Sequence, residues 1–139
     1  MRRAVITGIS GKIPTTPTPR EKIPNGRPGW FTYDWDSKDE KDTLTLIFKR
    51  KLLLDPALQG KEQNDVVTHE RRHETDFLGL ANALQKPLDA AYKQGDVDLD
   101  LWMKWFDYDV VAKSNAFHIA VGAPTDLNFQ PSDPRPWKP

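Results

Sequence analysis

The order of apolar and polar residues predicts two short strands followed by two helices. Arg3–Ile9 is rich in β-branched residues, and Thr43–Leu52 alternates in the manner of a half-buried strand. Val66–Leu84 and Leu99–Phe117 instead repeat their apolar residues at helical spacing. In a chain of 139 residues, this order predicts a single small α+β domain covering residues 1–139, with a short sheet beside the first helix and the second helix packed against it.

Two segments are too rich in proline for regular structure. Residues 10–29 carry five prolines and several glycines, and residues 122–139 carry five more prolines. These compositions predict a looped N-terminal arm and an extended C-terminal tail, with Trp137 as an anchor for the tail. We expect the aromatic residues that follow the arm to pin it onto the domain, with a ligand platform as the alternative; they are Trp30, Phe31, Tyr33 and Trp35. Asp34–Asp42 is interpreted as a charged turn.

The first helix contains His69-Glu70-Arg71-Arg72-His73, which matches the pattern HExxH. One turn separates the two histidines, so both imidazoles can bind one divalent metal ion, and Glu70 lies where it could hold a water molecule and take its proton. The motif falls on the apolar side of the helix, where buried polar groups need partners. The sequence therefore predicts an inward-facing metal site, the alternative being a surface helix that matches the pattern by chance. Asn64 or Asp65 would cap this helix, and Pro87 would end or kink it.

A catalytic zinc ion usually has three protein ligands, so the two histidines need a partner. No glutamate follows Glu74, and Gly79 stands where an extended motif would have a third histidine. Helical phase places Asp109 in the middle of an apolar side, where an unpaired carboxylate is costly. We therefore predict Asp109 as the third ligand, with His118 as the second candidate ligand. The alternative for Asp109 is structural: an ion pair with Lys113, or acceptance of a hydrogen bond from a ligating histidine.

Two other side chains are candidates for supporting roles. Asp76 lies one turn beyond His73, where it could orient a ligating histidine. Tyr108 could donate a hydrogen bond to an oxyanion formed during hydrolysis. Both predictions depend on the way the second helix packs against the first.

The composition of the chain limits the classes of partner and compartment that we expect. Twenty basic and twenty acidic side chains cancel, so the chain lacks the positive field that attracts nucleic acid. There is no cysteine, which excludes disulfides and thiolate ligands. Ala4–Ile9 is too short for a signal peptide, and no stretch is long enough to span a membrane. We expect no nucleic-acid partner, no membrane span, and export only through a specialised system.

The HExxH motif resembles that of the zincin superfamily of zinc metallopeptidases. This resemblance implies a zinc-activated water that attacks a peptide carbonyl, with His69 and His73 as zinc ligands, Glu70 as general base, and a peptide or protein as substrate. An aspartate as third ligand is similar to the aspzincin arrangement, but the GTxDxxYG signature of that family is not found around Asp109. The chain is therefore not assigned to that group.

A second resemblance rests on architecture. The small size, the proline-rich flanks and the missing signal peptide are similar to metallopeptidase domains of bacterial secretion-system effectors and toxins, which implies a larger parent chain or an immunity partner. Two other functions remain open at this point. One is a non-catalytic binding module with a zincin-like fold, and the other is an amidase that acts on peptidoglycan peptides.

Overall fold

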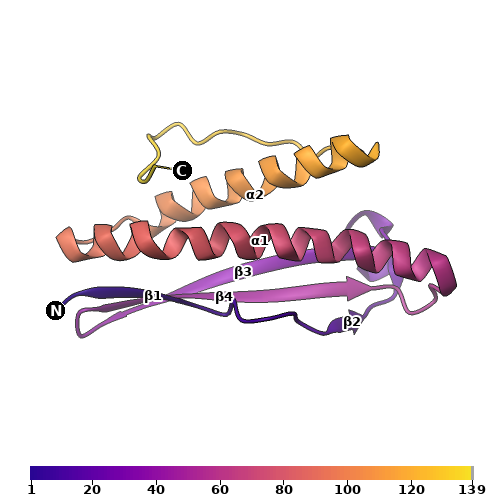
Figure 1. Ribbon diagram of the computed structural model, residues 1–139, viewed down its shortest axis with the longest axis horizontal. Coiled ribbons are helices and arrows are strands. Elements are labelled where there is room, and N and C mark those ends of the chain that lie inside the picture. The colour runs from indigo at the N-terminus through magenta and orange to yellow at the C-terminus, as the bar shows by residue number, and fades with distance from the viewer. Residues whose placement is uncertain (139) are drawn as a thin grey trace.

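The computed structural model describes residues 1–138, which form an α+β fold as the sequence predicts. The elements follow the chain in the order β1 (Arg3–Thr7), β2 (Thr15–Pro17), β3 (Gly29–Glu40), β4 (Thr43–Leu54), α1 (Gly60–Gln94) and α2 (Leu99–Val121), with short 3-10 turns η1 (Arg20–Lys22) and η2 (Pro24–Gly26) between β2 and β3. Figure 1 shows the sheet on one side of α1, with α2 on the other side of α1 and the tail lying over α2.

The sheet is built around β4. Along one edge β4 pairs with β1 near its start and with β2 near its end, both parallel, and along the other edge it pairs antiparallel with β3. The β3–β4 hairpin turns at Lys41 and Asp42, which both adopt positive φ angles, of 51° and 62°, as a tight hairpin requires. Most of the predicted charged turn at Asp34–Asp42 is therefore strand, because pairing with β4 extends β3 as far as Glu40.

The helix α1 is longer than its apolar pattern predicts. It begins after Gln59 rather than at a cap formed by Asn64 or Asp65, and it continues through Pro87 to Gln94. Beyond the proline, Leu88 and Tyr92 are fully buried against the sheet and α2. This tertiary packing compensates for the hydrogen bond that a proline removes from a helix interior.

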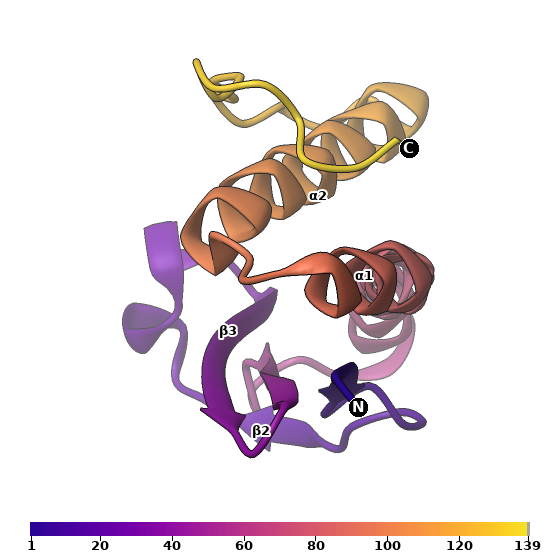
Figure 2. The ribbon, with the colours of Figure 1, turned by 90° about the vertical axis from the view of Figure 1, so that its left-hand side faces the viewer.

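The helix α2 has two apolar faces rather than one. Met103 and Phe106 are buried in the core with α1 and the sheet. On another side, Trp102 stacks on Trp137 of the tail with ring centroids 4.8 Å apart, and the Trp105 indole N–H donates to the tail backbone at 3.0 Å. The predicted anchoring of the tail by Trp137 is confirmed. Figure 2 shows α2 between α1 and the tail.

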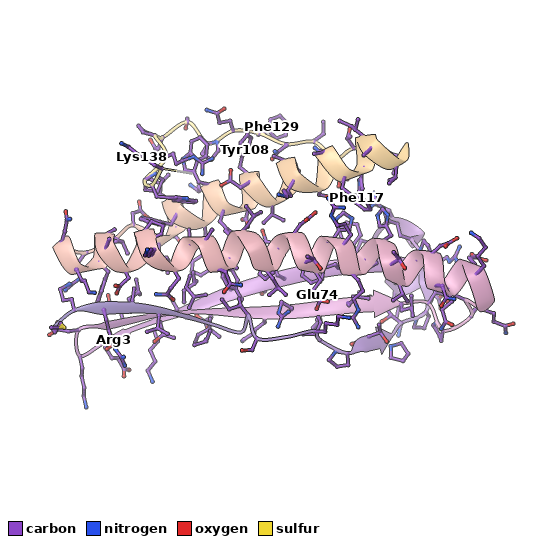
Figure 3. The ribbon with its side chains drawn as sticks, in the orientation of Figure 1. Arg3, Glu74, Tyr108, Phe117, Phe129 and Lys138 are labelled. Carbon is purple, nitrogen blue, oxygen red and sulfur yellow. The ribbon has the colours of Figure 1, made fainter. Side chains whose placement is uncertain are left out.

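The N-terminal arm is tied to the domain by one buried ion pair. Glu74 is 2% exposed and lies 3.5 Å from the Arg50 guanidinium, and it also accepts the Ile13 backbone N–H at 3.0 Å. Arg50 in turn donates to the carbonyl oxygens of Gly8 and Gly11, both at 2.9 Å. Figure 3 shows Glu74 on the side of α1 that faces the sheet. The aromatic residues expected to pin the arm belong to β3: Phe31, Tyr33 and Trp35 pack on the core, and Trp30 contacts the arm through the guanidinium of Arg27.

Among the described residues, neither helix combines the length and the apolar character that crossing a bilayer requires.

Candidate metal centre

Three histidines converge between the two helices. His69 and His73 come from α1 and His118 comes from the last turn of α2. Their Nε2 atoms are separated by 3.1 Å between His69 and His73, 3.2 Å between His69 and His118, and 3.0 Å between His73 and His118. This is a group close enough to bind a metal ion. Each Nε2 atom of a neutral imidazole carries either one hydrogen or one lone pair. Three Nε2 atoms that face one another at these distances therefore cannot all be paired by hydrogen bonds, whereas one shared cation can bind all three lone pairs.

The helical spacing of α1 and α2 explains how the site forms. His69 and His73 lie one turn apart, and their side chains therefore leave α1 in the same direction. On α2, Val110, Ser114 and His118 are each one turn apart and line one cleft together with the α1 histidines. His118 thus continues the stripe of α2 that faces α1, and its imidazole is 3% exposed.

The tail fixes the orientation of the His118 ring. Its Nδ1 atom lies 2.9 Å from the carbonyl oxygen of Pro124, and a carbonyl can only accept, so Nδ1 carries the hydrogen. The neutral ring then presents the lone pair of Nε2 to His69 and His73. A backbone carbonyl that fixes the tautomer of a ligating histidine in this way is a common support of metal sites.

The imidazoles of α1 are held in the form that binds metal. Burial lowers the pKa of His73 to about 4, and the neighbouring His69 and His118 add to this effect. Burial also lowers the pKa of His69, with further contributions from His118 and Arg27. Neutral imidazole is the form in which histidine coordinates a metal ion, so these shifts favour coordination at neutral pH.

Glu70 lies beside the histidines and is 7% exposed. Its Oε1 atom accepts the backbone N–H of Phe31 at 3.2 Å, whereas Oε2 is directed toward the start of β3. Burial raises the pKa of Glu70 to about 7, while the Phe31 amide and the Arg27 charge oppose this rise. The carboxylate is therefore oriented by the backbone of β3 and poorly solvated, which are properties expected of a proton acceptor.

Close packing of β3 against α1 makes this contact possible. A Cβ atom at Gly29 would lie 2.6 Å from Cγ1 of Val66 and 3.1 Å from Cγ of Glu70. Only glycine fits at this point without moving the helix or the glutamate. The sequence contains this glycine, but its role depends on the distance between β3 and α1 and so could not be inferred from local pattern.

An open cleft leads to the histidines. Its walls come from the start of β3, from the middle of α1 and from the second half of α2, with Asp126 of the tail and Arg27 also among the lining residues. Trp30, Thr32 and Val111 contribute partly exposed surface to it. A metal ion held by three histidines here would retain an open position toward the cleft, as catalytic sites do.

The prediction of Asp109 as third ligand is wrong in this arrangement. Both Asp109 oxygens accept hydrogen bonds from the Arg135 guanidinium at 2.7 Å, and Asp109 does not line the histidine cleft. The Asp109 carboxylate does need a partner, as its place on the apolar side predicts, but that partner is Arg135 of the tail. The structural alternative of a pair with Lys113 is also wrong, because the cation is Arg135. His118, the second candidate, lies with the two motif histidines.

The two supporting candidates have different positions. Asp76 lines the cleft, where both of its oxygens accept from Nε of Arg72, at 3.2 and 3.1 Å, and no hydrogen bond joins it to His69 or His73 among the described residues. Tyr108 lies on the tail side of α2, as Figure 3 shows, and does not line the cleft. The prediction of Tyr108 as an oxyanion donor is therefore wrong in this arrangement.

Sequence reasoning missed three residues near the site. Asn115 and Asp126 exchange two hydrogen bonds, from Asn115 Nδ2 to the Asp126 carbonyl at 2.9 Å and from the Asp126 amide to Asn115 Oδ1 at 2.8 Å. This clamp holds the tail beside α2 where Pro124 meets His118. Arg27 also lines the cleft, and its guanidinium lies 3.6 Å from the Asp126 carboxylate. All three contacts join residues that are not neighbours in the sequence, so no local sequence pattern predicts them.

The Asn115 clamp predicts a measurable effect on metal binding. Replacing Asn115 with alanine frees the tail near Pro124, and the His118 ring loses part of the restraint on its orientation. We expect metal affinity to fall by about tenfold, the low end of the effect seen when the hydrogen-bond support of a ligand is removed. Competition titration with a chromogenic chelator measures it. Asn82→Ala is the matched control, because Asn82 is an exposed asparagine on the other helix, α1. Equal metal affinities for the two variants would contradict the role of the clamp.

No protein-family model, curated protein or solved structure matches this chain. The chemistry of the site is therefore argued from its own geometry.

Proposed function

We propose that this protein is a zinc-dependent hydrolase that cleaves peptide bonds, with Glu70 as general base and His69, His73 and His118 as zinc ligands. One observation carries the proposal: three imidazole Nε2 atoms meet within 3.2 Å of one another beside a buried carboxylate, at the bottom of an open cleft.

The donor set favours zinc. Tetrahedral zinc with nitrogen ligands at about 2.0–2.1 Å places those nitrogens about 3.3–3.4 Å apart, close to the separations found here. Three neutral imidazoles suit a borderline cation better than calcium or magnesium, which prefer oxygen ligands. Three protein ligands with an open fourth position are the arrangement of catalytic rather than structural zinc.

Glu70 is suited to moving a proton. A bound zinc ion would supply Lewis acidity, activating a water molecule and polarising the scissile carbonyl. The Glu70 carboxylate, oriented by the Phe31 N–H on Oε1, would take the proton from the attacking water. The same carboxyl group then returns a proton to the leaving amine. The Phe31 amide keeps the carboxylate in one orientation through both transfers.

The free edge of β3 supports an extended peptide as substrate. Among the described residues β4 is paired on both sides, whereas the outer edge of β3 pairs with no other strand. The backbone groups of Phe31 and Tyr33 point to that edge by alternation, and both residues line the cleft. Further along, the amide of Trp35 is capped by the side chain of Asp34. Because the Phe31 N–H already donates to Glu70, a substrate strand would pair with the Phe31 carbonyl and with the backbone of Tyr33.

Hydrolysis in the presence and absence of zinc tests this proposal. We expect the zinc-loaded protein to cleave members of a mixed library of extended peptides, peptidoglycan stem peptides included, because the cleft is open and its strand edge is free. Removal of the metal with a chelator should abolish cleavage and added zinc should restore it, as followed by mass spectrometry. Zinc binding without any cleavage would favour the non-catalytic binding module, and cleavage of stem peptides alone would favour the amidase.

A further inference from the structure

Arg27 lines the cleft with a defined orientation. It follows η2, and its guanidinium sits over the Trp30 ring at 4.9 Å from the centroid. Its Nη2 atom is 3.6 Å from Oδ1 of Asp126, which belongs to the tail. All three residues line the same cleft as the histidines. A stacked and ion-paired guanidinium at this position presents its donors to the cleft.

The other charged groups of the cleft already have partners. Asp76 is paired with Arg72, and Glu70 is oriented by the backbone of β3. Arg27 is the one lysine or arginine among the residues that line the described cleft. It therefore supplies the fixed positive charge of this cleft.

The ion pair between Arg27 and Asp126 is easily exchanged. At 3.6 Å it lacks the short contact of a strong hydrogen bond, and the two side chains are 33% and 42% exposed. Pairs of this kind contribute little to stability, so a second carboxylate can replace the first at low cost. Asp126 stays close to the cleft in either case, because its backbone is held by Asn115.

We infer that Arg27 determines the specificity of this cleft by binding a carboxylate of the peptide substrate, in exchange for the internal carboxylate of Asp126. The inference rests on the proposed function, because it concerns the ligand of the same site. A guanidinium can bind a carboxylate through two parallel hydrogen bonds, which the present pair with Asp126 does not make. The carboxylate can come from an acidic side chain or from the C-terminus of a peptide, and these two sources share the same chemistry.

Three peptide hydroxamates that share one metal-binding group separate these sources. The first has a glutamine side chain and an amide end, the second has glutamate in place of glutamine, and the third has glutamine with a free carboxylate end. Each is titrated by calorimetry into the zinc-loaded protein and into zinc-loaded Arg27→Gln, Asp126→Asn and Arg3→Gln. Arg3 is an exposed arginine far from the cleft and provides a control for the loss of one charge. Circular dichroism and zinc content confirm that each variant is folded.

We expect the parent to bind at least one of the carboxylate probes about five to ten times more tightly than the neutral probe. Arg27→Gln should lose this preference, Arg3→Gln should keep it, and Asp126→Asn should increase it without changing affinity for the neutral probe. Equal affinities in the parent, or a preference that survives in Arg27→Gln, would overturn the role of Arg27 while leaving the hydrolase proposal intact. Failure of the neutral probe to bind zinc-loaded parent would overturn both, because no open metal position would then exist.

Discussion

Replacing His118 with alanine is expected to weaken zinc binding by at least about a hundredfold, more than the tenfold to hundredfold that loss of a supporting hydrogen bond costs. His118 supplies one of three imidazoles, and His69 and His73 alone leave the ion with half of a tetrahedral shell. The carboxylates that line the same cleft are already engaged, Glu70 with the backbone of β3, Asp76 with Arg72 and Asp126 with Arg27. Zinc content after dialysis against a weak chelator measures the loss.

Asp109→Ala is the control that separates the two candidate third ligands. It removes the carboxylate paired with Arg135 and should cost some stability, but zinc content should remain near that of the parent. Loss of zinc in Asp109→Ala together with its retention in His118→Ala would reverse the assignment. Thermal unfolding of both variants distinguishes loss of zinc from loss of fold.

Replacing Glu70 with glutamine is expected to lower turnover by about a hundredfold to ten-thousandfold, the range that a positioned general base contributes. The amide of glutamine can still accept the Phe31 N–H but cannot take a proton from water. Zinc content should stay at the parent level because the three histidines are unchanged. Rates of peptide cleavage at saturating zinc measure the effect.

Glu62→Gln is the matched control for this variant, since Glu62 is an exposed glutamate in the first turn of the same helix. It should cleave peptide at the rate of the parent. A Glu70→Gln variant that also cleaves at the parent rate would show that another group takes the proton. The proposed mechanism would then be wrong even if the zinc site is correct.

The motif helix could be predicted because its information is local. The spacing of His69 and His73 and the apolar residues around them fix one face of α1, and the burial of Glu70 follows from the same phase. The end of that helix could not be predicted in this way. Pro87 argues against continuation, and only the packing of Leu88 and of later residues on the core overrides it.

The third ligand could not be predicted because α2 contacts the rest of the molecule on two sides. The side with Trp105 and Asp109 faces the tail, while the stripe with Val110 and His118 faces the cleft. In a helical projection these two sides form one broad apolar arc with Asp109 in its middle. The projection therefore favours Asp109 as the ligand, although Asp109 belongs to the side that faces the tail. The partner of Asp109 is Arg135, which is far away in sequence and whose position depends on the path of the tail.

Strand pairing was also beyond local inference. The alternation of Thr43–Leu52 correctly identifies a half-buried strand, but it does not say which edges are covered. The structure pairs β4 on both sides and leaves β3 at the edge next to the histidines. The backbone amide that orients Glu70 therefore comes from Phe31, in a segment whose aromatic side chains suggested pinning of the arm or a ligand platform but gave no sign of a role for its backbone.

X-ray absorption spectroscopy of the zinc-loaded protein tests the central claim most directly. We predict three imidazole nitrogens and one non-protein oxygen at about 2.0–2.1 Å from zinc, with the oxygen replaced when a hydroxamate is added. Such a result would show both the assignment of His69, His73 and His118 and the open position that hydrolysis needs. A protein that binds no zinc, or a fourth protein ligand that closes the shell, would contradict the account.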